Sequence, residues 1–146
     1  MSGGEPWPGK GRVGVDWFAA SLDQILVLAR ASDLDADLAD DLIEARDLAL
    51  MMGDWAKHRA ACGDYFFTIS LSARSEDQVS RRTFTVPHDP EAAEFIAKLT
   101  LQLGALAGQR AQDHEVRRAL TELTALGVGL IKALTDSLSK LGGETS

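Results

Sequence analysis

Four acidic side chains between residues 33 and 44 have the spacing of a calcium-binding loop. Asp33, Asp35, Asp37 and Glu44 occupy the first, third, fifth and twelfth positions of such a loop, with helix-forming sequence on both sides. Calcium is a hard cation that prefers carboxylate oxygens, with a bidentate Glu closing the cage. The spacing therefore raises the hypothesis of a calcium site at these four residues.

Other residues of the same stretch weaken that hypothesis. The sixth loop position needs glycine for its sharp turn and holds Leu38, and the eighth holds Asp40 in place of an apolar residue. Acidic residues also suit the first turn of a helix, because the helix dipole is positive there. Apolar residues continue at helical spacing through the supposed loop, at Leu34, Leu38, Leu42, Ala45, Ala49 and Met52. We therefore favour an acid-rich helix N-terminus and expect no cofactor.

A second group with chemical potential is Asp54, His58 and Cys62, spaced to share one face of a helix. A zinc site would need a fourth ligand or a water, and a catalytic thiolate would need stabilisation. Cys62 instead falls near the end of a predicted helix, where the dipole disfavours a thiolate. We therefore predict no catalytic residue, and the chain is not expected to be an enzyme.

The amino-acid composition limits the classes of partner that the chain is expected to bind. The chain has 146 residues, with 15 Lys and Arg against 22 Asp and Glu, so its formal net charge is −7. A negative chain lacks the dense basic surface that nucleic acid requires. The single cysteine excludes an intrachain disulfide and favours a reducing compartment. No run of about 20 apolar residues is present to span a bilayer. We expect a cytoplasmic protein that binds neither nucleic acid nor membrane.

Four helices must position these residues. The apolar periodicity and the capping residues predict helices over residues 17–31, 34–61, 90–108 and 116–141. Asp16, Asp89 and Asp113 are the expected N-caps, and Gly63 is the expected C-terminal stop. The last helix has the longest apolar stripe: Val116, Leu120, Leu123, Gly127, Leu130, Leu134, Leu138 and Leu141.

Between the helix pairs the hydrophobic period changes from 3.6 to 2. Phe67, Ile69 and Leu71 alternate with small polar residues, and Phe84 and Val86 do the same after a polar turn at 74–78. This pattern predicts a β-hairpin over about residues 65–86, ended by Pro87. An isolated hairpin is marginal in water, so its apolar face must be covered.

We therefore predict a mainly α fold: a four-helix bundle-like single domain over residues 14–143, with the β-hairpin inserted between the helix pairs. Residues 1–13 are expected to form a flexible tail and residues 144–146 a frayed end. The predicted function is a non-catalytic interaction or oligomerisation module, such as an adaptor, regulatory subunit or scaffold, that binds itself as a homodimer or another protein. The alternative is a sensor of a small ligand or divalent metal, using residues 33–44 or a pocket between helices. The predicted interaction residues are Phe67, Ile69, Leu71, Phe84, Val86, Leu123, Leu130 and Leu134.

Overall fold

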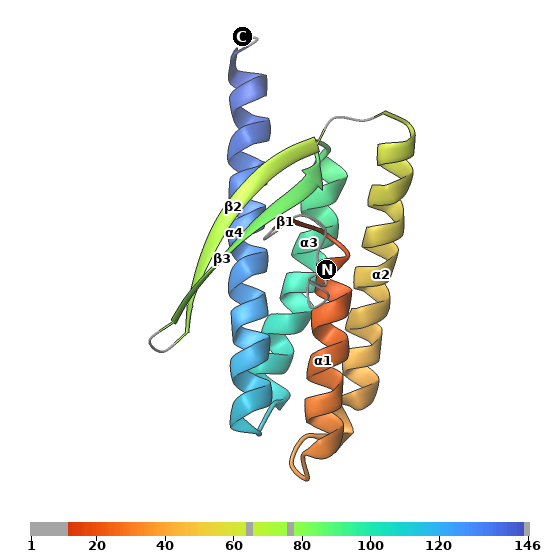
Figure 1. The fold of residues 1–146 in the computed structure, drawn as a ribbon, viewed down its shortest axis with the longest axis vertical. Coiled ribbons are helices and arrows are strands. Elements are labelled where there is room, and N and C mark those ends of the chain that lie inside the picture. Colours follow the sequence, from red (N-terminus) through yellow and green to blue (C-terminus); the bar gives the residue numbers. More distant parts are fainter. Residues whose placement is uncertain (1–11, 64–65, 76–77, 145–146) are drawn as a thin grey trace, which may run out of the picture.

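Four helices run side by side, and a small sheet lies across one of them (Figure 1). The computed structural model describes residues 12–63, 66–75 and 78–144. The helices are α1 (Trp17–Ala31), α2 (Ala39–Ala61), α3 (Pro90–Ala105) and α4 (His114–Glu144). The strands are β1 (Arg12–Gly14), β2 (Phe66–Ser75) and β3 (Gln78–Pro87). The predicted mainly α fold with an inserted hairpin is confirmed.

The sheet has one strand more than the sequence suggested. β2 and β3 pair antiparallel, with Phe67 opposite Val86 and Ile69 opposite Phe84. β1 adds to the free side of β3 in parallel, and Val13 pairs with Phe84. The strand order is therefore β1-β3-β2. Residues 12 and 13, expected to belong to the tail, are thus part of the sheet, and residues 1–11 of that tail lie outside the described residues.

Local capping explains some of the helix boundaries. The Asp89 carboxylate accepts a hydrogen bond from the Glu91 backbone N–H at 2.8 Å, and Pro90 follows at the first helical position. α2 ends before Gly63, whose φ of 83° is a left-handed conformation that glycine adopts without strain. Asp16 precedes α1 as expected, but its backbone is helical and its side chain makes no capping hydrogen bond. The expected cap is therefore absent at Asp16.

Three helices differ from their predicted limits. The second helix was expected from Leu34, but a 3₁₀ turn at Ala36–Leu38 comes first and α2 begins at Ala39. α3 ends at Ala105 and continues as a wider π-helical turn, Leu106–Arg110, closed by a 2.8 Å hydrogen bond from the Ala111 N–H to the Leu106 carbonyl. α4 runs on to Glu144 and extends beyond the other helices in Figure 1.

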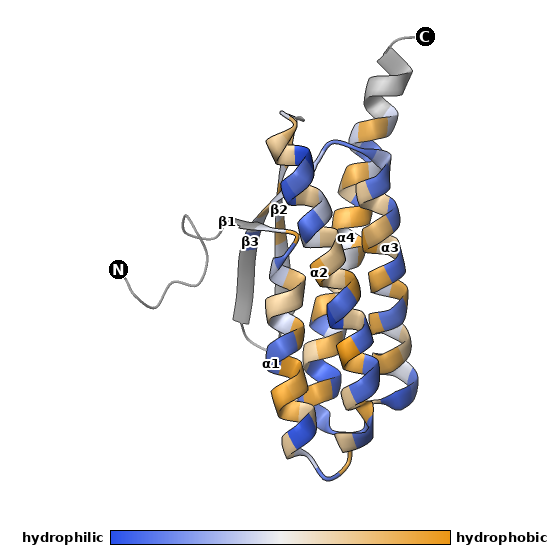
Figure 2. Ribbon diagram, turned by 90° about the vertical axis from the view of Figure 1, so that its right-hand side faces the viewer, coloured by the Kyte–Doolittle hydropathy of each residue, from blue (hydrophilic) through white to orange (hydrophobic). Residues whose placement is uncertain are grey.

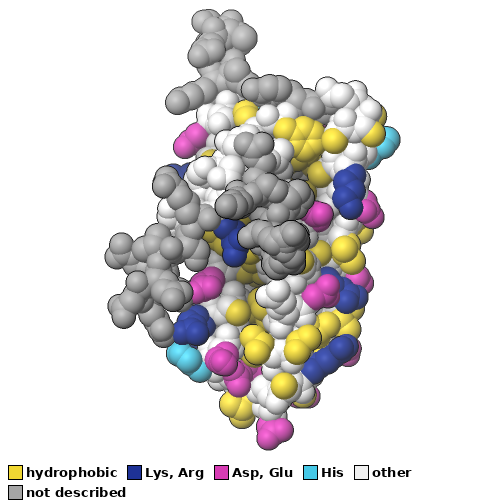
Figure 3. All heavy atoms as spheres, viewed as in Figure 1, with side chains coloured by type: hydrophobic (Ala, Val, Ile, Leu, Met, Phe, Trp, Pro, Cys, Tyr) yellow, Lys and Arg dark blue, Asp and Glu magenta, His cyan; other side chains and the backbone are white. Residues whose placement is uncertain are grey.

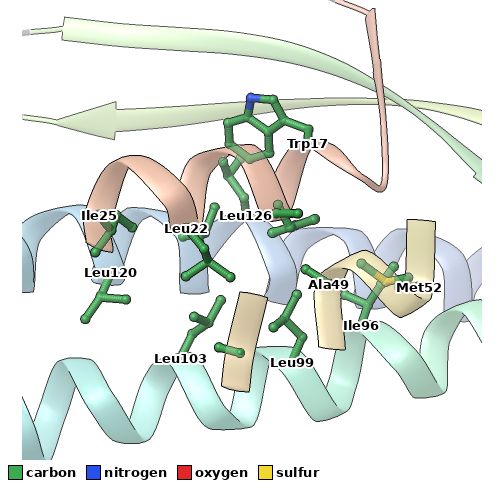
Figure 4. Packing of buried hydrophobic residues seen from close by; sticks show 14 of the residues in the cluster. Trp17, Leu22, Ile25, Ala49, Met52, Ile96, Leu99, Leu103, Leu120 and Leu126 are labelled. Atoms are coloured by element: carbon green, nitrogen blue, oxygen red, sulfur yellow. The ribbon is translucent and has the colours of Figure 1, made fainter. Parts of the chain in front are cut away.

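The core lies between the four helices and beneath the sheet. Figure 4 shows Leu22 and Ile25 of α1 meeting side chains from the other helices. At the sheet end, the Phe18 and Phe84 rings stack with centroids 5.9 Å apart, and the Trp17 ring meets both edge-on. Aromatic pairs of this kind contribute about 0.5–1.5 kcal/mol beyond their buried area. The hairpin is thereby fastened to α1 as well as to α4.

Candidate functional site

The acidic segment is a structural tie in this fold. Asp35 is buried, and its two carboxylate oxygens accept hydrogen bonds from the backbone N–H groups of Gln112 and Asp113, both at 2.8 Å. Asp33, Asp37 and Glu44 are exposed. Within residues 12–63, 66–75 and 78–144, no group of three or more His, Cys, Asp or Glu side chains is placed to hold a metal ion. The structure does not bring the four predicted calcium ligands together.

Asp35 also explains how the α3–α4 link is held. Next to it, the Asp113 carboxylate accepts hydrogen bonds from the backbone N–H groups of Val116 and Glu115, which confirms it as the N-cap of α4. The Val116 N–H, followed by the Ser32 hydroxyl, holds the pKa of Asp113 below its usual value, since both stabilise the charged carboxylate. The acidic segment and the α3–α4 link thus stabilise each other.

Of the second predicted group, the structure joins His58 and Cys62. The His58 Nε2 atom lies 3.8 Å from the Cys62 sulfur, and both residues are exposed at the C-terminal end of α2. Reactive thiols are typically found at helix N-termini or beside cationic groups, and Cys62 lies at the opposite end of its helix. The contact therefore gives Cys62 no evident activation.

The residues predicted as an interaction surface are mostly core residues. Six are buried, and Phe67 and Leu71 are half-buried against the core; the buried ones are Ile69, Phe84, Val86, Leu123, Leu130 and Leu134. These side chains therefore lie in or against the core of their own chain, where the hairpin packs on α4, and their predicted role in interaction stays a prediction. Leu71, for example, sits directly over Gly129 of α4.

Large apolar side chains are displayed elsewhere, along the groove between α2 and α3. We define the α2–α3 face by the residues that line this shallow hollow of about 520 Å³: Glu44, Asp47, Leu48 and Met51 from α2, and Lys98, Leu101 and Gln102 from α3. Met51 is 58% exposed and Leu101 is 75% exposed. In Figure 2, which views the bundle from the α2 side, α2 and α3 lie next to each other. This face is an apolar centre with charged residues around it.

Contacts at both ends hold the two helices of this face in place. At one end the Trp55 and Phe95 rings lie 5.3 Å apart, and Arg59 forms ion pairs with Asp89 at 3.1 Å and Glu91 at 3.8 Å. At the other end Arg110 pairs with Asp41 at 3.0 Å. The α2–α3 face is therefore preorganised.

Sequence reasoning missed this face although a signal was present. The apolar stripe of the third helix runs through Leu99 and Leu103, both buried. Leu101 stands between them, off the stripe, and a large apolar residue off the stripe has to point away from the core. Hydrophobic side chains also reach the surface among charged ones over α1 and α2, as Figure 3 shows.

A smaller pocket of about 180 Å³ opens between α1, α4 and β3. Its apolar wall is formed by Trp17, Ile25, Leu123 and Leu126, and its polar lining by Ser21, Gln24, Arg82 and Glu122. The Arg82 guanidinium lies 4.7 Å from the centre of the Trp17 ring, a cation–π contact. Arg82 has the same parity as Phe84 and Val86, so strand alternation places it on the inner face of the sheet.

Comparison of the chain with protein-family models, with curated proteins and with solved structures found no match. Among the described residues, no helix is both long enough and apolar enough to cross a membrane.

Proposed function

We propose that the protein is a non-catalytic interaction module that binds another polypeptide through the α2–α3 face. One observation carries the proposal: Met51 and Leu101 are large apolar side chains exposed next to each other on a preorganised surface. Full burial of such a side chain contributes about 1.5–3 kcal/mol. Because these two side chains are exposed to water, part of this burial free energy is not realised in the free protein. Binding of a partner over them would add it to the stability of the complex.

The chemistry of the face suits protein recognition. Binding energy in protein interfaces concentrates in a few central apolar anchors, while the polar residues around them exclude water and set specificity. Leu101 has the position of such an anchor, and Met51 is flexible enough to adapt to a partner. Because α2 and α3 are fastened at both ends, little conformational entropy would be lost on binding. In this proposal the module acts in the cytoplasm, where its lone thiol stays reduced.

Photo-crosslinking tests the proposal with the full chain in its own host. A photoreactive amino acid replaces Leu101, and a matched control replaces Val128, which is 53% exposed on α4. We expect crosslinked polypeptides, identified by mass spectrometry, from position 101 and not from position 128. Equal or absent crosslinking at the two positions would overturn the proposal.

The pocket beside Trp17 favours a second candidate function, a small-ligand sensor. Its apolar wall together with Arg82 and Glu122 has the mixed character of small-molecule sites. Native mass spectrometry of protein isolated from its host would reveal a retained small mass. A Ser21→Trp variant, which fills the pocket, should lose that mass, whereas Val27→Trp on the exposed side of α1 should keep it. A wild-type protein without a retained mass would remove support for the sensor function.

A further inference from the structure

We propose that the partner on the α2–α3 face is a second copy of this chain, bound about a two-fold axis that runs along the groove between α2 and α3. The inference rests on the proposed function and names its partner. Such an axis sets α2 of one copy against α3 of the other, so that each contact occurs twice. The face must then be complementary to itself in charge and in shape.

The charges of the face meet that requirement. α2 contributes the carboxylates of Glu44 and Asp47, both exposed, and α3 contributes the ammonium group of Lys98, also exposed. Within the described part of the chain, Lys98 has no acidic side chain at ion-pair distance, whereas Asp47 lies 3.6 Å from Arg46. A two-fold axis along the groove sets α3 of each copy, which carries Lys98, against α2 of the other, which carries Glu44 and Asp47. The basic helix of each copy thus faces the acidic helix of the other.

The apolar centre is self-complementary in the same way. Met51 lies on the α2 side of the groove and Leu101 on the α3 side. Under the same axis, Met51 of one copy meets Leu101 of the other. Met51 and Leu101 of the two copies then form one cluster of four large apolar side chains. A single dimer contact therefore buries both exposed residues of each copy.

The arrangement of acidic residues on α2 and a basic residue on α3 is significant because the whole chain has a net charge of −7. Two copies of an acidic chain repel each other overall, and a wholly acidic contact surface would add to that repulsion. On the α2–α3 face a basic residue stands on one helix and acidic residues on the other, so local attraction opposes the overall repulsion. The proposed dimer should therefore be sensitive to charge reversal at these positions.

Sedimentation velocity over a range of protein concentrations tests the proposal with the full chain. We expect a concentration-dependent dimer. Leu101→Ser, which acts twice per dimer, should weaken dimerisation by about a hundredfold, while Val128→Ser should leave it unchanged. Lys98→Glu, and the double variant Glu44→Lys with Asp47→Lys, should each weaken it by about tenfold.

Mixing the charge variants provides the decisive control. An equimolar mixture of Lys98→Glu with Glu44→Lys/Asp47→Lys places opposite charges at both symmetry-related contacts of the interface, so heterodimers should form more tightly than either variant dimerises alone. Lys132→Glu, and Asp33→Lys with Asp136→Lys, make the same changes of net charge on exposed residues away from the face, and should leave dimerisation near the wild-type value. Circular dichroism should show that every variant is folded.

A wild-type protein that stays monomeric at all concentrations overturns the inference, as does a dimer that Leu101→Ser and the charge reversals leave intact. The crosslinking experiment separates this failure from that of the proposed function. A monomer that crosslinks from position 101 to a different polypeptide would leave the proposed function standing without self-association. A monomer without any crosslink from that position would overturn both.

Discussion

Two apolar surfaces of this protein differ in exposure: one is buried within the fold and the other is open to solvent. The side of α4 that carries Leu123, Leu130 and Leu134 is covered by the hairpin and by the other helices, and these side chains are buried. The α2–α3 face carries Met51 and Leu101, and no described element lies over it. Both surfaces are helical and apolar. They differ because other elements of the chain pack over the first surface, whereas none of the described elements packs over the second.

The difference teaches that the strongest hydrophobic pattern is a poor guide to which apolar side chains stay exposed. A long, regular stripe is what an internal core needs, and the chain satisfies it internally. Large apolar side chains that stay exposed are fewer and lie outside the regular pattern, as Leu101 does between Leu99 and Leu103. The surplus apolar residues thus mark the free surface better than the stripe does.

The largest expected effect contrasts one residue from each surface. Leu130→Ala should lower the free energy of unfolding by about 2–5 kcal/mol, because a fully buried leucine leaves a cavity. Leu101→Ala should change it by less than about 0.5 kcal/mol when measured at high dilution. Urea denaturation followed by circular dichroism measures both. Similar losses at the two positions would break the distinction between the covered and the open surface.

A second contrast concerns the hydrogen bonds between Asp35 and the α3–α4 link. Asp35→Ala should cost about 1–3 kcal/mol, because the backbone N–H groups of Gln112 and Asp113 lose their acceptors. Asp33→Ala, an exposed neighbour, is the matched control and should cost little. The same urea experiment applies. If Asp35→Ala is neutral, water satisfies these groups and the tie contributes nothing.

Close packing on the covered side can be tested at two glycines. A methyl group at Gly127 would collide with the side chain of Thr100, whose hydroxyl is held by a 2.6 Å hydrogen bond to the Ile96 carbonyl. At Gly104 the nearest atom, the Thr124 methyl carbon, would lie at 3.6 Å, an ordinary contact. Gly127→Ala should therefore destabilise by about 0.5–2 kcal/mol after its gain in helix propensity. Gly104→Ala should stabilise by about 0.5–1 kcal/mol. Thermal unfolding of both variants would show whether the signs differ.

The smallest effect is a pH dependence at the start of α4. Folding lowers the pKa of Asp113, so its contribution to stability is present above the unfolded value of about 4 and is lost as pH falls through the lower folded value. Asp113→Asn retains a capping oxygen but has no carboxyl to titrate. Melting temperatures measured from pH 6 downward should fall less steeply below about pH 4 in the variant. Parallel curves would show that Asp113 is not linked to folding.

Local signals in the sequence predicted the helices, the hairpin and the caps at Asp89 and Asp113, because each depends on residues within one turn or one strand. The elements that were missed depend on partners far along the chain. β1 is too short to show a pattern, and the role of Asp35 requires Gln112, which lies 77 positions away. The core location of the residues predicted for interaction has the same origin, since periodicity reports that a side chain is buried and not which segment buries it.

The pairing of β1 with β3 also sets an order of events during synthesis. Phe84, the strand partner of Val13 and the stacking partner of Phe18, is translated some 70 residues after either. At about 5–20 residues per second, the N-terminal strand and the aromatic end of α1 wait several seconds for their counterparts. The apolar side of α4, on which the hairpin packs, is translated later still. Formation of these distant contacts is the slow step expected for this fold. Until they form, the apolar side chains of α1 and α2 can be buried only against each other.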